Sequence, residues 1–140
     1  DYGRGIWPFS STWNWASGSG VQQGRTVGLN FGGRWTDGTG MTENGFVIDG
    51  IATKISDDIH FEYDSNDFMR PWRIRTATSD QVYLEFVPFF ARAAKTNAAV
   101  IRSEVHQMIG YFRGRIKTPD GDTLLIDNLV GWAEEHQARW

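Results

Sequence analysis

The stretch Gln81-Val82-Tyr83-Leu84-Glu85-Phe86-Val87 decides the fold class. Its apolar and polar side chains alternate, and a period of two is typical of a β-strand with one buried face. The same alternation occurs in residues 25–33 and 59–63. In strands, the following apolar residues would point into the core: Val82, Leu84, Phe86, Val27, Leu29, Phe31, Ile59, Phe61 and Tyr63.

Turn signals separate these alternating runs. Asp49-Gly50 predicts a tight hairpin of type I′ between two short strands. Residues 118–122 predict a second turn, between a long strand and the next one. Pro71 and Pro88 are expected at strand edges or bulges, because proline cannot donate to a strand ladder. Strands at this spacing predict an all-β fold, an antiparallel sandwich or barrel.

The evidence for helices is thin. Residues 92–99 are rich in alanine, but they lie between strand-like runs, and a strand is the alternative. Residues 131–140 are compatible with a short C-terminal helix or with a strand. The prediction is therefore an all-β domain with one optional helix at its C-terminal end.

The composition is typical of one globular domain: 140 residues, of which 40% are hydrophobic and 22% charged. A net charge of −3 argues against a nucleic-acid partner, because phosphate binding needs a basic surface. The chain has no cysteine, which excludes disulfides and zinc–thiolate sites and fits a cytoplasmic location. No apolar run reaches the roughly 18–20 residues of a spanning helix, so we expect no membrane span.

An aromatic-lined pocket is predicted from residues 1–45, which carry four of the seven tryptophans among many glycines. Glycine allows backbones to approach closely, and a buried indole needs a partner for its N–H. Together they suggest tightly curved β-structure around an aromatic-lined space. We expect these side chains to bind the ligand: Trp13, Asn14, Trp15, Asn30, Trp35 and Asn44.

Glu104 and His106 are the main candidates for acid–base catalysis. They lie two positions apart in residues 102–108, so on a strand they share a face with Met108. A neighbouring carboxylate can hold a histidine in one tautomer and tune it for proton transfer near neutral pH. The alternative is a satisfied polar pair with a structural role.

A second candidate group is Glu134-Glu135-His136. Adjacent carboxylates can raise one another's pKa, but neighbours in sequence point in different directions, and a solvated terminal face is the alternative. We take His136, Glu43 and Asp37 as secondary catalytic candidates. The sequence lacks His-x-x-x-His and His-x-His spacing, so we expect neither a metal nor another cofactor.

Several long motifs resemble the family called domain of unknown function 2804. They are residues 13–18, 28–45, 69–73, 95–97, 102–107 and 131–136. The resemblance implies that residues 1–140 form a single lipocalin-like β domain, the C-terminal part of a longer protein with an N-terminal companion domain. That family is distantly similar to carotenoid 1,2-hydratases and other proteins with two lipocalin-like domains. This similarity implies an antiparallel lipocalin-like barrel or half-barrel.

Three functions fit these observations. The first is an enzyme that binds an apolar, isoprenoid- or acyl-like molecule and catalyses cofactor-free acid–base chemistry such as hydration or cyclisation; aromatic faces would stabilise a developing cation. The second is a non-catalytic lipid-binding or carrier protein, because small barrels can hold a ligand without reacting with it. The third is a carbohydrate-binding module, in which tryptophans would stack on sugar rings.

Overall fold

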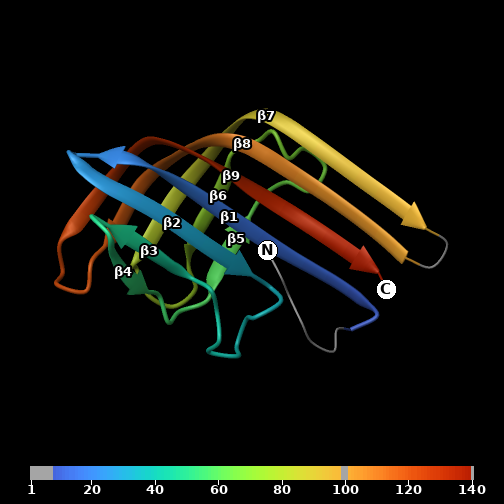
Figure 1. Ribbon diagram of the computed structural model, residues 1–140, viewed down its shortest axis with the longest axis horizontal. Helices are drawn as coiled ribbons and strands as arrows, with labels where there is room; N and C mark the ends of the chain where they lie inside the picture. The colour runs from blue at the N-terminus through green and yellow to red at the C-terminus, as the bar shows by residue number, and fades with distance from the viewer. Residues whose placement is uncertain (1–7, 99–100, 140) are drawn as a thin grey trace.

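The computed structural model describes residues 8–98 and 101–139, and within them the secondary structure consists of strands. All pairs are antiparallel, in the order β4-β3-β2-β1-β9-β8-β7-β6-β5 (Figure 1). The strands are β1 (Ser10–Gln22), β2 (Arg25–Gly33), β3 (Gly45–Ile48), β4 (Ile51–Lys54), β5 (Ile59–Glu62), β6 (Trp72–Thr76), β7 (Val82–Ala98), β8 (Ile101–Lys117) and β9 (Thr123–Arg139).

The sheet curls strongly into a half-barrel, so that the end of β2 approaches β5. A Cβ atom added at Gly33 would lie only 2.9 Å from the Phe61 ring and 3.0 Å from the Ile59 carbonyl oxygen. Two hydrogen bonds connect the same regions: the Gly38 N–H donates to Asp58 at 2.9 Å, and Asn44 Nδ2 donates to the Asp57 carbonyl at 3.2 Å. The all-β, antiparallel prediction is confirmed, and the shape is consistent with a lipocalin-like barrel.

The predicted turns are also confirmed. Asp49 and Gly50 join β3 to β4 with φ angles of 51° and 83°, and two positive φ angles are what a type I′ turn requires. Residues 118–122 join β8 to β9. Pro71 directly precedes β6, and Pro88 lies where the register between β7 and β8 shifts. The two prolines therefore lie at a strand start and at a bulge, the positions that proline tolerates in a sheet.

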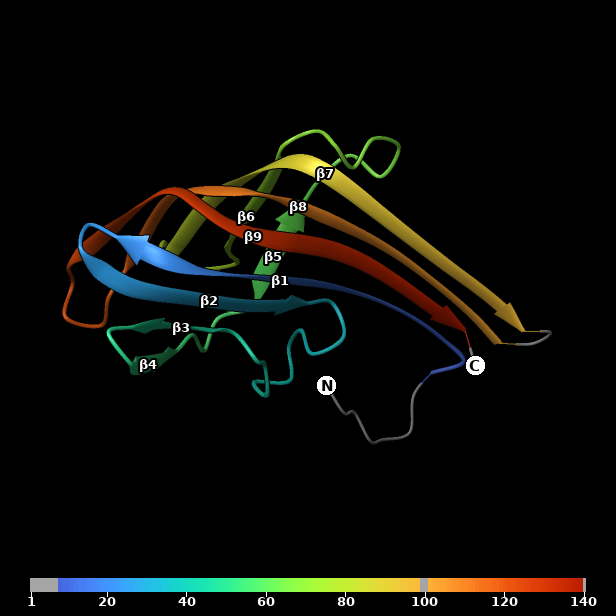
Figure 2. The same ribbon diagram turned by 45° about the horizontal axis from the view of Figure 1, so that its top comes forward.

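The optional C-terminal helix is not formed. Residues 131–139 continue β9, and residues 92–98 continue β7, so both ambiguous segments are strand; Trp140 lies outside the described residues. Each of these segments is paired along its length with β8, which supplies the backbone partners that a helix would have found within itself. The far ends of β7 and β8 project from the sheet (Figures 1 and 2), whereas β1 is paired with β9 as far as Arg139. No described residue belongs to a helix long and apolar enough to cross a bilayer.

The hydrophobic core fills the inner, concave side of the curl. Alternating side chains of the neighbouring strands meet there, as the sequence predicted for Val27, Leu84 and Ile59. The largest fully buried side chains are Trp72, Phe31, Phe86 and Phe112. We call the side of the sheet that carries this core the inner face and the opposite side the outer face.

A row of glycines crosses the middle of the sheet. Gly18 pairs with Gly131, and Gly131 pairs with Gly110, so three adjacent strands lack a side chain at the same level. The space is taken by aromatic rings: Cβ atoms added at Gly131 and Gly110 would lie 2.6 Å from the Phe112 ring and 2.8 Å from the Phe86 ring, respectively. The bare backbone therefore lets core rings pack directly on the strands.

Candidate functional site

Strand alternation divides the predicted pocket residues between the two faces of the sheet. Asn14 pairs with Glu135 on the inner face, whereas Trp13 and Trp15 pair with His136 and Glu134 on the outer face. Asn14 is 1% exposed, as expected beside the core. The tryptophans and Asn14 therefore do not line one space, because adjacent residues of a strand point in opposite directions.

The outer face carries a group of four tryptophans that we call the indole cluster: Trp13, Trp15, Trp35 and Trp132. The ring centroids of Trp13 and Trp35 are 6.1 Å apart, and Trp15 meets Trp132 edge-on at 5.5 Å. These separations lie in the favourable range for aromatic pairs. The cluster therefore places indole rings beside His136 and Glu134, the cross-strand partners of Trp13 and Trp15.

Asn30 and Glu43 fix the orientation of Trp15. The Trp15 indole N–H donates to Asn30 Oδ1 at 2.9 Å. Asn30 Nδ2 in turn donates to the Glu43 carbonyl oxygen at 3.0 Å and to its carboxylate at 3.2 Å. Both residues were predicted site residues, and the structure brings them to the indole cluster, where Glu43 is exposed.

Glu134 is a carboxylate buried within the outer face. It is 9% exposed, and its cross-strand partners are Trp15 on β1 and Gln107 on β8. Gln107 Nε2 donates to Glu134 Oε2 at 3.1 Å. Burial raises the pKa of the Glu134 carboxyl, and the bond from Gln107 only partly opposes this. A raised pKa keeps the proton on the acid at higher pH, as a proton donor requires.

His136 lies two residues further along β9 on the same face, roughly 7 Å away along the strand. Its ring stacks on Trp13 with centroids 4.0 Å apart, and its Nε2 is 2.8 Å from the Ser103 hydroxyl. Burial lowers the pKa of His136, which favours the neutral imidazole. The outer face thus combines an acid whose pKa is raised by burial with a histidine whose pKa is lowered by burial.

These two shifts predict opposite effects of pH on stability. For Glu134 the folded pKa lies above the ordinary value of 4.5, so stability falls as pH rises between the two values, by up to about 1.4 kcal/mol per pH unit. For His136 the folded pKa lies below 6.5, so stability falls as pH drops from 6.5 towards the folded pKa.

Urea unfolding at pH 4–8 measures both effects. The fall in stability with rising pH should vanish in Glu134→Gln, and the fall in stability below pH 6.5 should vanish in His136→Gln. An unchanged pH profile in both variants would contradict the burial of these groups.

On the inner face, Tyr63 connects four segments. Its hydroxyl donates to the Glu135 carboxylate and accepts from Asn14 Nδ2 at 3.1 Å and from Arg34 Nη2 at 3.0 Å. Burial, together with the adjacent Glu135 carboxylate, raises the pKa of Tyr63 to about 12. The phenol keeps its proton, and its one donor and two acceptor positions are all used. Tyr63, which follows β5, is therefore hydrogen-bonded to β1, to β9 and to Arg34 after β2, across the open side of the half-barrel.

Glu104 and His106 also lie on the inner face, 3.3 Å apart, as their spacing predicted. Glu104 forms an ion pair with Lys95 at 2.9 Å, and the His106 ring stacks on Phe68 at 4.5 Å. The hydrogen bond from Lys95 is the main reason why the pKa of Glu104 is lowered. A lowered pKa is the opposite of what a proton donor needs, and the sheet separates this pair from the indole cluster.

The remaining predicted residues have structural contacts. Asn44 is fully buried, and its Oδ1 accepts the Gly32 N–H at 2.8 Å. Asp37 is exposed and accepts the Arg34 N–H at 2.8 Å, which closes the turn after β2. Neither residue contacts the indole cluster through these bonds. Among the described residues, no three histidine or carboxylate side chains are grouped to hold a metal ion.

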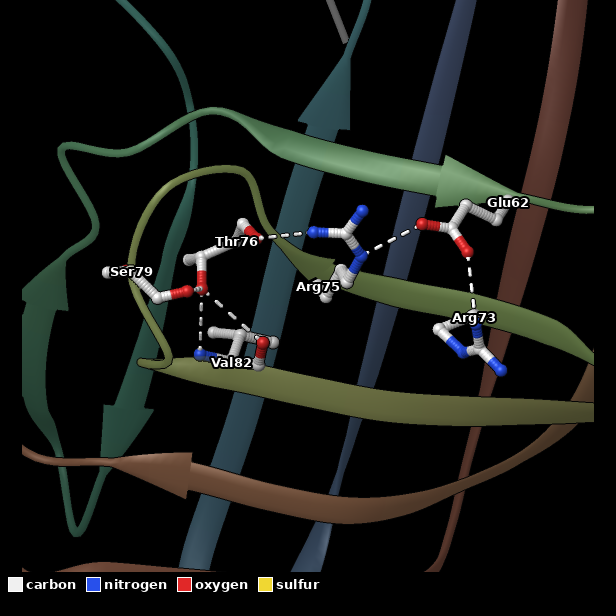
Figure 3. A network of polar contacts seen from close by, with 6 residues as sticks. All are labelled: Glu62, Arg73, Arg75, Thr76, Ser79 and Val82. Carbon is white, nitrogen blue, oxygen red and sulfur yellow. Dashed lines mark hydrogen bonds and ion pairs between the residues drawn. The ribbon is translucent and has the colours of Figure 1, made fainter.

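A further polar network extends from β5 through β6 to the start of β7 (Figure 3); its ion pairs face solvent, whereas Thr76 is buried. Glu62 lies between Arg73 at 3.2 Å and Arg75 at 2.8 Å, and the bond from Arg75 lowers the pKa of Glu62. The Thr76 hydroxyl bonds to the Ser79 carbonyl at 2.8 Å. The side chains of this ion-pair group are 36–56% exposed, and exposed pairs contribute little to stability. The network borders an open cleft of about 490 Å³ lined by Glu62, Tyr63, Asp64, Arg70, Pro71, Trp72, Arg73, Tyr83, Leu84 and Glu85.

Comparison with known proteins gives one match. A family model described as domain of unknown function DUF2804 matches residues 1–140. The chain belongs to the DUF2804 family. No curated protein and no solved structure matches the chain.

The motifs that carried the DUF2804 resemblance meet in the folded domain. Residues 13–18 lie in β1 and residues 131–136 in β9. These two segments are paired with each other, and the indole cluster lies on their outer face. Residues 102–107 lie in β8 on the other side of β9. Three motifs that are far apart in the DUF2804 sequence therefore form the central strands of the sheet.

Sequence reasoning missed two residues that the structure brings forward. Glu134 is adjacent to His136 but is not among the catalytic candidates predicted from the sequence, although alternation along β9 puts Trp132, Glu134 and His136 on one face. That alternation was the available signal. Tyr63 was assigned to the core, and its bond to Glu135 spans 72 residues, so no local pattern indicated it.

Proposed function

We propose that this DUF2804 domain binds an apolar small molecule, isoprenoid- or acyl-like, against the indole cluster, and that Glu134 and His136 catalyse cofactor-free acid–base chemistry on it. Hydration or cyclisation of a carbon–carbon double bond is the reaction class. The observation that carries the proposal is the Glu134 carboxyl, which is 9% exposed, has a raised pKa and lies among tryptophans. Perturbed acids of this kind concentrate at functional sites.

The proposed step begins with a proton. The protonated Glu134 carboxyl donates its proton to one alkene carbon, and the other carbon becomes a cation that faces the indole rings. Aromatic faces stabilise cations, with tryptophan the most effective. A water molecule then adds to the cation, and neutral His136 accepts the proton that this water loses. His136 then releases this proton to water and Glu134 takes up a proton from water, which restores the site, so the net reaction is addition of water across the double bond.

The sequence resemblance gives secondary support. As part of this proposal we take the family to be distantly similar to carotenoid 1,2-hydratases and other two-domain lipocalin-like proteins. That similarity agrees with acid chemistry on an apolar substrate. A cytoplasmic location and an N-terminal companion domain remain predictions of the same resemblance and composition.

Turnover of an isoprenoid alkene tests the proposal. Farnesol incubated with the protein in H₂¹⁸O should gain ¹⁸O, as measured by mass spectrometry, and Glu134→Gln should reduce the rate at least about 100-fold. Glu85→Gln is the matched control, because Glu85 is an exposed carboxylate on β7 whose partner on β8, Arg113, lies well along that strand from Gln107, the partner of Glu134. Full activity of the Glu134→Gln variant would contradict the assignment.

The same experiment identifies the carrier alternative. A carrier would bind farnesol or lauric acid with equal affinity in the wild type and in Glu134→Gln, and no ¹⁸O would be incorporated by either. Binding of an oligosaccharide in place of these apolar probes would indicate the carbohydrate-binding alternative, for which Trp35, at 43% exposure, is the candidate stacking platform.

A further inference from the structure

Two arginines face each other near the end of the long strands. Arg102 on β8 and Arg139 on β9 are directly paired in the antiparallel register, so their side chains share one face. Like charges placed directly opposite in a sheet are destabilising. Within residues 8–98 and 101–139, no carboxylate lies within ion-pair distance of either guanidinium group. An unneutralised pair of this kind is complementary to an anion.

The two arginines line a cleft of about 340 Å³ on the inner face. Its lining residues are Ser10, Arg102, Glu104, Gln137, Ala138 and Arg139. Ser10 is the cross-strand partner of Arg139, and Gln137 is the partner of Glu104, so the polar side chains form two neighbouring rows. The cleft therefore contains uncharged hydrogen-bond donors beside the guanidinium groups.

The charges that surround the cleft leave it positive. Glu104 is the carboxylate in its lining, and Lys95 already pairs with it at 2.9 Å. Glu135 lies one row further along β9 and accepts bonds from Tyr63 and from Gln137, the latter at 2.8 Å. The Arg139 guanidinium carbon lies 4.7 Å from the centre of the Phe9 ring, a cation–π contact that brings no negative charge to the guanidinium group.

We propose that Arg102 and Arg139 form a binding site for the oxyanion group, carboxylate or phosphate, of a small-molecule ligand. The planar guanidinium fork matches both groups and binds them through paired N–H donors. Ser10 and Gln137 supply further donors from β1 and β9. This site lies on the opposite face from the indole cluster, so it is independent of the proposed chemistry at Glu134.

Titration with inorganic phosphate and with acetate tests this site. The probe is the Nε–H signals of the arginines in ¹H–¹⁵N spectra of the whole chain, recorded at constant ionic strength with chloride as the reference anion. We expect the signals of Arg102 and Arg139 to shift saturably with phosphate or acetate. Arg102→Gln and Arg139→Gln should each weaken binding at least about tenfold, the loss of one charge-assisted bond. The stronger of the two probes identifies the oxyanion.

The control and a second measurement keep the result unambiguous. Arg113→Gln removes an exposed arginine of β8 that bonds to Asn128, and it should leave the titration unchanged. Without added oxyanion at low salt, Arg102→Gln should raise the melting temperature by about 1–3 °C, because it removes the repulsion between the paired charges. Linear, chloride-like shifts, equal weakening in Arg113→Gln, or a lower melting temperature for Arg102→Gln would each overturn the proposal. Binding to anionic vesicles but not to phosphate or acetate would overturn it in favour of a membrane surface.

Discussion

Gly131→Ala is expected to destabilise the domain by about 3 kcal/mol or more, the largest effect that we predict for a single methyl group. The added Cβ would lie 2.3 Å from the Ser17 carbonyl oxygen and 2.6 Å from the Phe112 ring. Neither neighbour can move freely, because Ser17 is in the paired strand β1 and Phe112 is fully buried. Urea unfolding followed by circular dichroism measures the loss.

The glycine row explains why this position is so sensitive. Gly18, Gly131 and Gly110 lie side by side in β1, β9 and β8, and the Phe112 and Phe86 rings occupy the space that side chains would need. A methyl group at the centre of the row must therefore separate two strands or displace a core ring. Both movements disturb close packing, which tolerates little added volume.

Gly28→Ala is the matched control for this prediction. Gly28 also lies within a strand, β2, but the nearest atom to an added Cβ is the Val47 Cβ at 3.8 Å, an ordinary contact. We expect this variant to differ from the wild type by less than about 0.5 kcal/mol or to be slightly more stable. Similar losses in Gly28→Ala and Gly131→Ala would mean that the glycine row has no special role.

Tyr63→Phe is expected to cost about 2–3 kcal/mol at neutral pH. The substitution keeps the ring stack on Trp72, whose centroid is 4.1 Å away, and removes only the hydroxyl. Glu135 then loses a charge-assisted hydrogen bond, and buried Asn14 loses an acceptor for its amide. The cost arises because these groups stay buried without the partner that satisfied them.

A pH profile separates the loss of this hydroxyl from general damage. The folded pKa of Tyr63 is about 12, above the ordinary value of 10, so its contribution is complete below pH 10 and is lost as pH rises towards 12. The stability of the wild type should therefore fall more steeply than that of Tyr63→Phe across this range. Tyr83→Phe, at an exposed position, is the control and should behave like the wild type. Equal alkaline slopes in all three proteins would contradict the role of Tyr63.

The strands and turns of this domain could be predicted from the sequence because their signals are local. Residues 81–87 alternate with a period of two, and Asp49-Gly50 supplies the two positive φ angles of its hairpin. The long strand β9 was harder. Residues 131–139 have the composition of either element, and only their pairing with both β1 and β8 decides for strand.

The division of the site between two faces could not be predicted with the same security. The usual expectation places indoles inside and amides outside, but Asn14 points inward while Trp13 and Trp15 point outward. Strand alternation requires Asn14 to point to the opposite face from Trp13 and Trp15. Which of the two faces carries the core is decided only by the register with β9. The partnership of Glu134 with Gln107 and Trp15 depends on that register as well.

The most direct test of the central claim is to observe which indoles contact an apolar ligand. Farnesol or lauric acid is titrated into ¹⁵N-labelled protein, and the indole N–H signals are assigned by single Trp→Phe variants. Trp72 is the internal reference, because it is fully buried on the inner face and its N–H donates to the Phe68 carbonyl at 2.9 Å. We predict saturable shifts for Trp13 and Trp15 with Trp72 unchanged, whereas a shifted Trp72 signal with Trp13 and Trp15 unmoved would place the ligand inside the curl and contradict an outer-face site.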